Sequence, residues 1–284
     1  MPANTRLLSL ALLLTLLTLM AGQTAWAQRP VGTAPPTEAS PTAKNGGPDS
    51  SQPVETVQPP SKQENKAIKA FRDVPPTDAD KKTQLAEDFI EKYPNSRYRS
   101  EAVAWLARAY MAKGQFDKLQ AEGDKELELK PANPASLAVL GSNLSRVVTP
   151  ATPDEQKHLD KAQEFCKKSL DVLDTAQKPS DVSEDKFKQA KDETLSVDYS
   201  GLGTVAFREQ KYDDAITNLE KAIKLSGGSD PVNYYLLGKA NEAKQNFDQA
   251  LAAYTKCAAI QSGMQSACDS SAKDMKTHGA VLPK

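Results

Sequence analysis

A short motif that recurs at a fixed interval constrains the fold of this chain more than any other feature of its sequence. Residues 199–203 read Tyr-x-x-Leu-Gly, and residues 234–238 repeat that pattern at an offset of 35 residues. Twelve residues after each glycine comes an alanine, Ala215 or Ala250, with an aromatic residue three positions before it. A constant period of this length is typical of repeat architectures, in which each unit is one supersecondary motif. The second half of the chain is therefore predicted to fold as a row of similar units.

Weaker copies of the motif lie earlier in the chain. Residues 103–107 match residues 137–141 at an offset of 34 residues. Apolar residues recur every three or four positions, as in Leu85, Phe89 and Tyr93, and no convincing strand alternation is found. This period is that of an amphipathic helix, so the chain is predicted to be all-α.

The residue types in the motif have a physical reason. Two helices of one hairpin touch closely only where one of them carries glycine or alanine, and the second helix presents Ala215 or Ala250 at that contact. The leucine before the small residue is predicted to fill the space between successive hairpins, and one hairpin alone cannot cover its apolar face. The small residues are Ala107, Gly141, Gly203 and Gly238, and the leucines are Leu106, Leu140, Leu202 and Leu237.

These features resemble the tetratricopeptide repeat family over about residues 100–264. The resemblance implies a helix-hairpin solenoid. Its units are residues 100–133, residues 134–178 with an inserted loop, residues 183–229 with an extended first helix, and residues 231–263. Residues 64–99 are predicted to hold N-terminal helices of a degenerate half repeat, and residues 264–277 a capping helix. Gly123 departs from the pattern, because a glycine inside a helix predicts a local distortion.

The N-terminus reads as an export signal. Arg6 precedes an apolar run over residues 7–20, and Ala25-Trp26-Ala27 follows. This pattern predicts a signal peptide over residues 1–27 with cleavage after Ala27. The alternative is an uncleaved membrane anchor, although a span needs about 20 apolar residues.

Residues 28–63 are rich in proline and poor in large apolar side chains, which predicts a disordered linker because nothing offsets the entropy of ordering it. The helix that follows ends in Tyr93-Pro94-Asn95-Ser96, and it also looks like the repeats of bacterial envelope proteins. Those include outer-membrane assembly lipoproteins and the periplasmic coordinator of cell division. We therefore expect a periplasmic or otherwise exported protein.

Export places the three cysteines in an oxidising compartment. Cys257 takes the interface-facing position of the last unit's second helix, and Cys268 takes the matching position of the capping helix. We hypothesise that they form a disulfide across one seam, which would add about 2–3 kcal/mol of stability. The other reading is two buried thiols. Cys166 is expected to stay reduced and packed.

Composition argues against several classes of function. There are 36 Lys and Arg against 37 Asp and Glu, so a basic nucleic-acid binder is not expected. The two histidines, His158 and His278, are expected to be solvated surface residues without catalytic partners. The sequence predicts neither an enzyme nor a cofactor.

The resemblance implies a partner-binding groove, because the first helix of each tetratricopeptide hairpin lines the concave surface. The groove residues would be Ala104, Arg108, Ser142, Arg146, Thr204, Phe207, Arg208, Tyr235, Lys239 and Glu242. Clamp-type members carry lysine and asparagine where this chain has Ala104 and Arg108, so that clamp is absent.

The function implied is a non-catalytic scaffold or adaptor in the bacterial cell envelope that binds a partner peptide or helix in this groove. It would not insert stably into a membrane once the signal is removed. The alternative is a membrane-anchored structural subunit of outer-membrane assembly or cell-division machinery.

Overall fold

The computed structural model describes residues 60–130 and 132–282. The predicted signal peptide and nearly all of the predicted linker lie outside these residues. Within them every regular element is a helix, which confirms the all-α prediction. The helices are α2 (Lys62–Asp73), α3 (Ala79–Lys92), α4 (Arg99–Ala112), α5 (Phe116–Glu128), α6 (Pro134–Val147), α7 (Glu155–Thr175), α8 (Glu184–Arg208), α9 (Tyr212–Leu225), α10 (Pro231–Ala243), α11 (Phe247–Ala259) and α12 (Gln265–Thr277).

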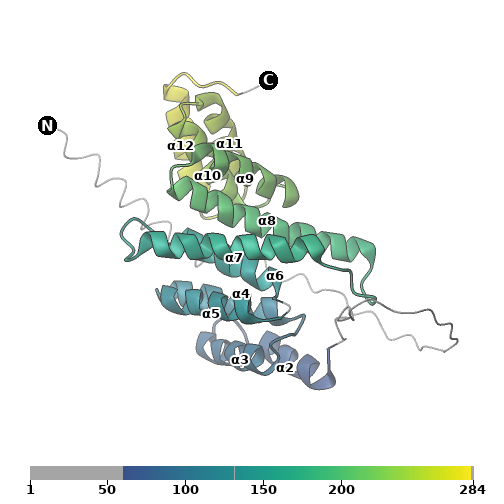
Figure 1. The fold of residues 1–284 in the computed structure, drawn as a ribbon. Coiled ribbons are helices and arrows are strands. Elements are labelled where there is room, and N and C mark those ends of the chain that lie inside the picture. Colours follow the sequence, from purple (N-terminus) through teal and green to yellow (C-terminus); the bar gives the residue numbers. More distant parts are fainter. Residues whose placement is uncertain (1–59, 131, 283–284) are drawn as a thin grey trace.

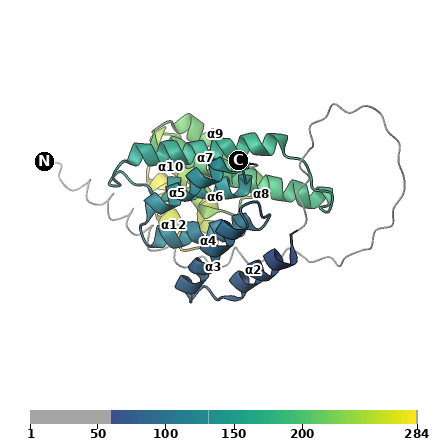
Figure 2. The same cartoon turned by 60° about the horizontal axis from the view of Figure 1, so that its bottom comes forward.

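The helices stack as hairpins along one direction. Helices α2 to α5 lie at one end, the long helices α7 and α8 cross the middle, and α9 to α12 lie at the other end (Figure 1). Helices α6 and α7, α8 and α9, and α10 and α11 pack as neighbours in sequence, while α4 packs on α6 and α6 on α8. In a second view α2 and α3 again lie at one side of the molecule, and α7 runs beside α8 (Figure 2). The protein is thus a helical repeat solenoid, as the repeat predicted.

The apolar core is divided along this stack. The first cluster runs from α2 to α8, which it reaches at Val205, and it includes Leu106, Leu137 and Phe165. A small cluster around Leu219 joins α8, α9 and α10. The last cluster, around Tyr254, joins α10, α11 and α12. Each unit is therefore stabilised mainly by its neighbours.

The glycines of the motif lie where helices of one hairpin touch. A Cβ atom on Gly203 would lie 2.7 Å from Leu219 Cγ, and one on Gly238 would lie 2.5 Å from the Tyr254 ring. The contacted side chains stand one helical turn after Ala215 and Ala250, rather than at the alanines themselves. The requirement for a small residue was predicted correctly, but the residue opposite it was not.

Two of the four motif leucines differ from the prediction. Leu106 and Leu140 are fully buried, whereas Leu202 and Leu237 are only partly buried. The expected distortion at Gly123 is also wrong, because α5 continues through it. A Cβ atom there would lie 2.2 Å from the Phe165 ring, so the glycine makes room for that ring to pack.

The first helix begins earlier than predicted. Helix α2 starts at Lys62, because Ser61 accepts a hydrogen bond from the Glu64 backbone and the Glu64 side chain returns one from the Ser61 backbone. This reciprocal pair satisfies two backbone donors at the helix start. The predicted linker therefore ends before residue 63.

Candidate functional site

Three of the predicted groove residues are not accessible to a partner. Ser142, Thr204 and Tyr235 are 5%, 3% and 5% exposed. Helices α6 and α8 approach so closely that a Cβ atom on Gly201 would lie 3.1 Å from Ser142 Cα. Thr204 donates a hydrogen bond to the Ser200 carbonyl oxygen at 2.8 Å, and Tyr235 packs on Tyr254 with ring centroids 5.8 Å apart. These residues hold the stack together, and we correct their assignment to the open groove.

Arg146 connects three helices. Its guanidinium lies 2.6 Å from the Asp230 carboxylate and donates to Ser200 Oγ at 2.7 Å. Asp230 is also the N-cap of α10, where it accepts a hydrogen bond from the Val232 backbone. Arg146 therefore ties the end of α6 to α8 and to the start of α10, and its charge is already partnered.

Lys239 and Glu242 form a local network on α10. Their ion pair measures 3.0 Å, and Tyr254 Oη donates to Glu242 Oε2 at 2.5 Å. Burial, followed by this hydrogen bond to Glu242, raises the pKa of Tyr254, so the phenol stays protonated. Both charged side chains remain partly exposed. Lys239 and Glu242 can therefore make polar contacts with a partner, and because they pair with each other they add little net charge to this surface.

Arg108 and Arg208 differ from Arg146 in having no carboxylate partner. None of the ion pairs within residues 60–130 and 132–282 involves either guanidinium. Arg108 is exposed, and partial loss of water around its guanidinium lowers its pKa. Arg208 donates to the carbonyl oxygen of Val148, just beyond the end of α6, and burial lowers its pKa as well.

The remaining groove residues are partly buried. Ala104 lies on α4, and Phe207 packs beside Tyr212 with ring centroids 6.0 Å apart. We define the candidate face as the accessible residues Arg108, Phe207, Arg208, Lys239 and Glu242. All five lie in the last turns of α4, α8 and α10. These are first helices of their hairpins, and first helices run in the same direction in a solenoid of stacked repeats.

The sequence did not reveal a buried ionic cluster between α4 and α5. Arg99 pairs with Glu122 at 3.1 Å and also with Glu126, and it donates to the Ile90 carbonyl oxygen at 2.6 Å. All three ionic side chains are buried. Burial raises the pKa of Glu126 to about 7, although Arg99 opposes the shift. No local sequence signal marks such a cluster, because its members come from different helices.

A second buried carboxylate, Asp198, was also missed. It accepts a hydrogen bond from Ser169 Oγ at 2.7 Å, while its Oδ1 atom has no partner among the described atoms. Burial raises its pKa to about 8. Cys166, which lies near it, is buried and carries a free thiol whose pKa is also raised by burial. These groups are sealed from solvent and form no accessible reaction site.

The histidine prediction needs a correction. His158 is buried, and its Nδ1 atom lies 3.0 Å from Gln120 Oε1. His278 is exposed, as expected. Across the described residues, no group of three or more His, Cys, Asp and Glu side chains is placed to hold a metal ion. No helix in that part of the chain combines the length and apolarity needed to cross a membrane.

Stacked helix hairpins define a class of proteins that present extended surfaces to other proteins. Residues 232–263, which cover nearly all of α10 and α11, match the family model of the tetratricopeptide repeat. Together with the stacked hairpins, this match supports the tetratricopeptide family. Repeats of this kind generally mediate protein–protein interaction. Comparison with curated proteins found no match.

Proposed function

We propose that this chain is a non-catalytic scaffold or adaptor of the bacterial cell envelope, and that a partner peptide or helix binds its candidate face. The observation that carries the proposal is that Arg108 and Arg208 make no ion pair within the described residues, and that both lie, like Phe207, near the C-terminal ends of first helices. Arginine and aromatic side chains are enriched among the residues that dominate binding energy. A partner carboxylate would supply the missing charge.

The envelope location is supported by the leader pattern over residues 1–27 and by the paired cysteines, which suit an oxidising compartment. The alternative is an anchored structural subunit of outer-membrane assembly or division machinery that retains residues 1–27. The mass of the mature N-terminus distinguishes the two. A chain that starts at Gln28 supports export, and a chain that keeps Met1 supports the anchored form.

Position-specific crosslinking in intact cells tests the binding face. A photo-crosslinking aromatic residue replaces Phe207 in one strain and the exposed Lys273 on α12 in another. We expect a defined crosslinked band from position 207 that is absent from position 273. Adding Arg108→Glu should reduce that band about tenfold, as expected for loss of a binding hot spot. Lys273→Glu makes the same charge change away from the face and should leave the band intact.

Arg108 suits this test because no ion pair of the described residues involves its side chain, so reversing its charge should not disturb folding. Equal crosslinking from positions 207 and 273 would exclude the candidate face as the binding site. So would a band that Arg108→Glu leaves unchanged.

A further inference from the structure

The capping helix α12 packs mainly on one neighbour, α11. Its buried residues also join the cluster that contains Val232 and Tyr235 of α10. Helices α3 to α11 each pack on two or more others. An end helix with one neighbour has the least non-covalent support in a solenoid.

The face that α12 buries is also small. Its buried residues are Cys268, Ala272 and Met275, and of these only Met275 is a large apolar side chain. Burying one such side chain offsets only a small part of the conformational entropy that is lost when a helix of this length is ordered. The non-covalent docking of this 13-residue helix is therefore weak.

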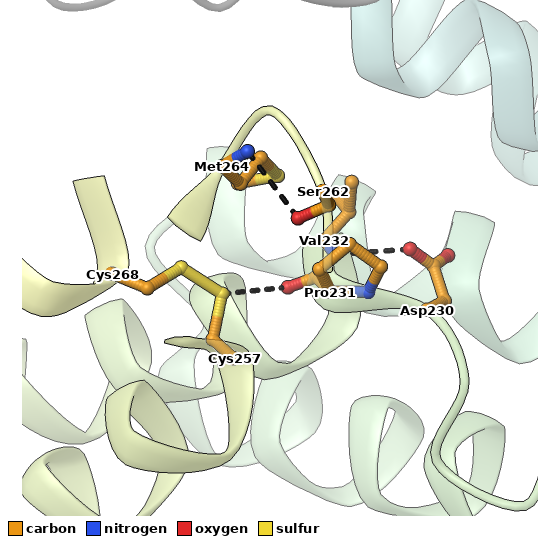
Figure 3. Close-up of a disulfide and its surroundings, with 7 residues drawn as sticks. All are labelled: Asp230, Pro231, Val232, Cys257, Ser262, Met264 and Cys268. Atoms are coloured by element: carbon orange, nitrogen blue, oxygen red, sulfur yellow. Dashed lines mark hydrogen bonds between the residues drawn. A yellow bond between two sulfur atoms is a disulfide. The ribbon is translucent and has the colours of Figure 1, made fainter. Parts of the chain in front are cut away.

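Contacts at the two ends of the hairpin add to this docking. Near the connecting loop, a disulfide joins Cys257 of α11 to Cys268 of α12 (Figure 3). At the far end, the His278 ring stacks on Phe247 with centroids 5.3 Å apart, and the Val281 backbone donates to Asp248 Oδ1 at 2.8 Å. The far-end hydrogen bond is exposed to solvent, so water competes with it. Apart from the loop that joins the two helices, the disulfide is the covalent link between α11 and α12.

The surroundings of the disulfide also accommodate the reduced form. Cys257 Sγ lies 3.3 Å from the carbonyl oxygen of Pro231 (Figure 3). A disulfide sulfur has no hydrogen to donate, but a thiol at this position can donate to that oxygen. After reduction the Cys257 thiol would therefore keep a hydrogen-bond acceptor where it lies on α11. Cys268 would lose the covalent bond that holds α12 to α11.

We propose that the Cys257–Cys268 pair makes α12 a redox-dependent cap of the last repeat. In the oxidised chain α12 stays docked on α11. A dithiol reductant transfers two electrons and two protons to the sulfur–sulfur bond, which becomes two thiols while the reductant becomes a disulfide. Helix α12 then separates from α11, and the apolar side of α11 that α12 had covered becomes exposed. This inference depends on the fold alone and not on the proposed partner.

Both sulfurs belong to residues that are fully buried. A reductant therefore reaches the bond only after α12 has opened. The rate of reduction is thus expected to follow local opening of α12 rather than the intrinsic rate of thiol–disulfide exchange.

Hydrogen exchange of the full chain, oxidised and after reduction with dithiothreitol, tests the proposal. We expect amide protection in α12 to fall at least about tenfold on reduction, with little change in α4 to α8. Trypsin should cleave at Lys273 and Lys276 faster in the reduced chain. The double variant Cys257→Ala/Cys268→Ala should show the open pattern with or without reductant. Cys166→Ala removes the remaining cysteine and should leave the response of α12 unchanged.

Three results would overturn the proposal. The first is equal protection of α12 in the oxidised and reduced chains. The second is loss of protection in α4 to α8 together with α12, because the change would then be global. The third is free thiols at both positions in the non-reduced protein.

Discussion

Asp198 is a carboxylate that the fold buries beside Ser169 without a cation. Its pKa of about 8, raised from 3.8, means that the folded chain holds a proton that the unfolded chain releases. Between pH 3.8 and about pH 8 the free energy of unfolding therefore falls as pH rises. Above about pH 8 Asp198 is ionised in both states, and its destabilising effect is complete. Below 3.8 the carboxyl is neutral in both states and has no effect.

We expect Asp198→Asn to stabilise the protein, because the amide keeps the shape of the carboxyl without its charge. The gain should be small at about pH 5 and reach about 1–3 kcal/mol at about pH 9. Thermal unfolding of both proteins across this range measures it. Glu126 also titrates in this window, but it is common to both proteins and cancels in the difference. Asp171→Asn, at an exposed position of α7, should change nothing.

Arg99 illustrates the opposite case, a buried cation with two acidic partners. Arg99→Leu leaves Glu122 and Glu126 buried without their counter-charge, so we expect a loss of about 3–5 kcal/mol in the free energy of unfolding. Chemical denaturation measures that loss. The control is Arg72→Leu, because Arg72 pairs with Glu101 at an exposed site where ion pairs contribute about 0–1 kcal/mol. Equal effects of the two substitutions would contradict the account of Arg99.

Among the helices, α5 shows how one neighbour overrides helix propensity. Gly123→Ala should stabilise an isolated helix by about 1 kcal/mol. Here the added Cβ would meet the buried Phe165 ring, so we expect a net destabilisation of about 1–3 kcal/mol. Phe165→Leu should relieve part of that effect, and a double-mutant cycle measured by denaturation gives the coupling. Additive effects would show that the ring and the glycine do not interact.

The repeat spacing predicted the helices well because that spacing is local. The extended first helix expected in the unit over residues 183–229 is α8, which begins at Glu184. The capping of α3 was less predictable. Its N-cap, Asp78, makes no side-chain cap hydrogen bond, so no local capping pattern marks the start of this helix.

The candidate site was harder to predict than the helices. Ser142 and Thr204 occupy groove positions by register, but α6 and α8 meet through small side chains and close over them. Whether a position on a first helix is open depends on how closely the next hairpin approaches. The repeat pattern of one unit carries no information about that distance. The same limit hid Arg99 and Asp198, whose partners come from other helices.

At the scale of the whole molecule, the described residues form three apolar clusters in place of a single core, and the partly buried Leu236 packs against two of them. Leu219 belongs to the small middle cluster and is fully buried, whereas Leu202 of the repeat motif is only partly buried. Leu219 is therefore the sharper test of the solenoid. We expect Leu219→Ala to cost about 2–5 kcal/mol through loss of burial and the cavity left behind.

The distribution of that loss along the chain is the informative measurement. In a solenoid stability is a sum of units and interfaces between neighbours. Hydrogen exchange of Leu219→Ala should therefore show protection falling most in α8 to α10 and least in α2 to α5, since the first cluster shares no buried contact with Leu219. The matched substitution Leu137→Ala, in the first cluster, should give the reverse pattern. Protection that falls equally in all helices for both variants would mean one cooperative core, and the division into units would be wrong.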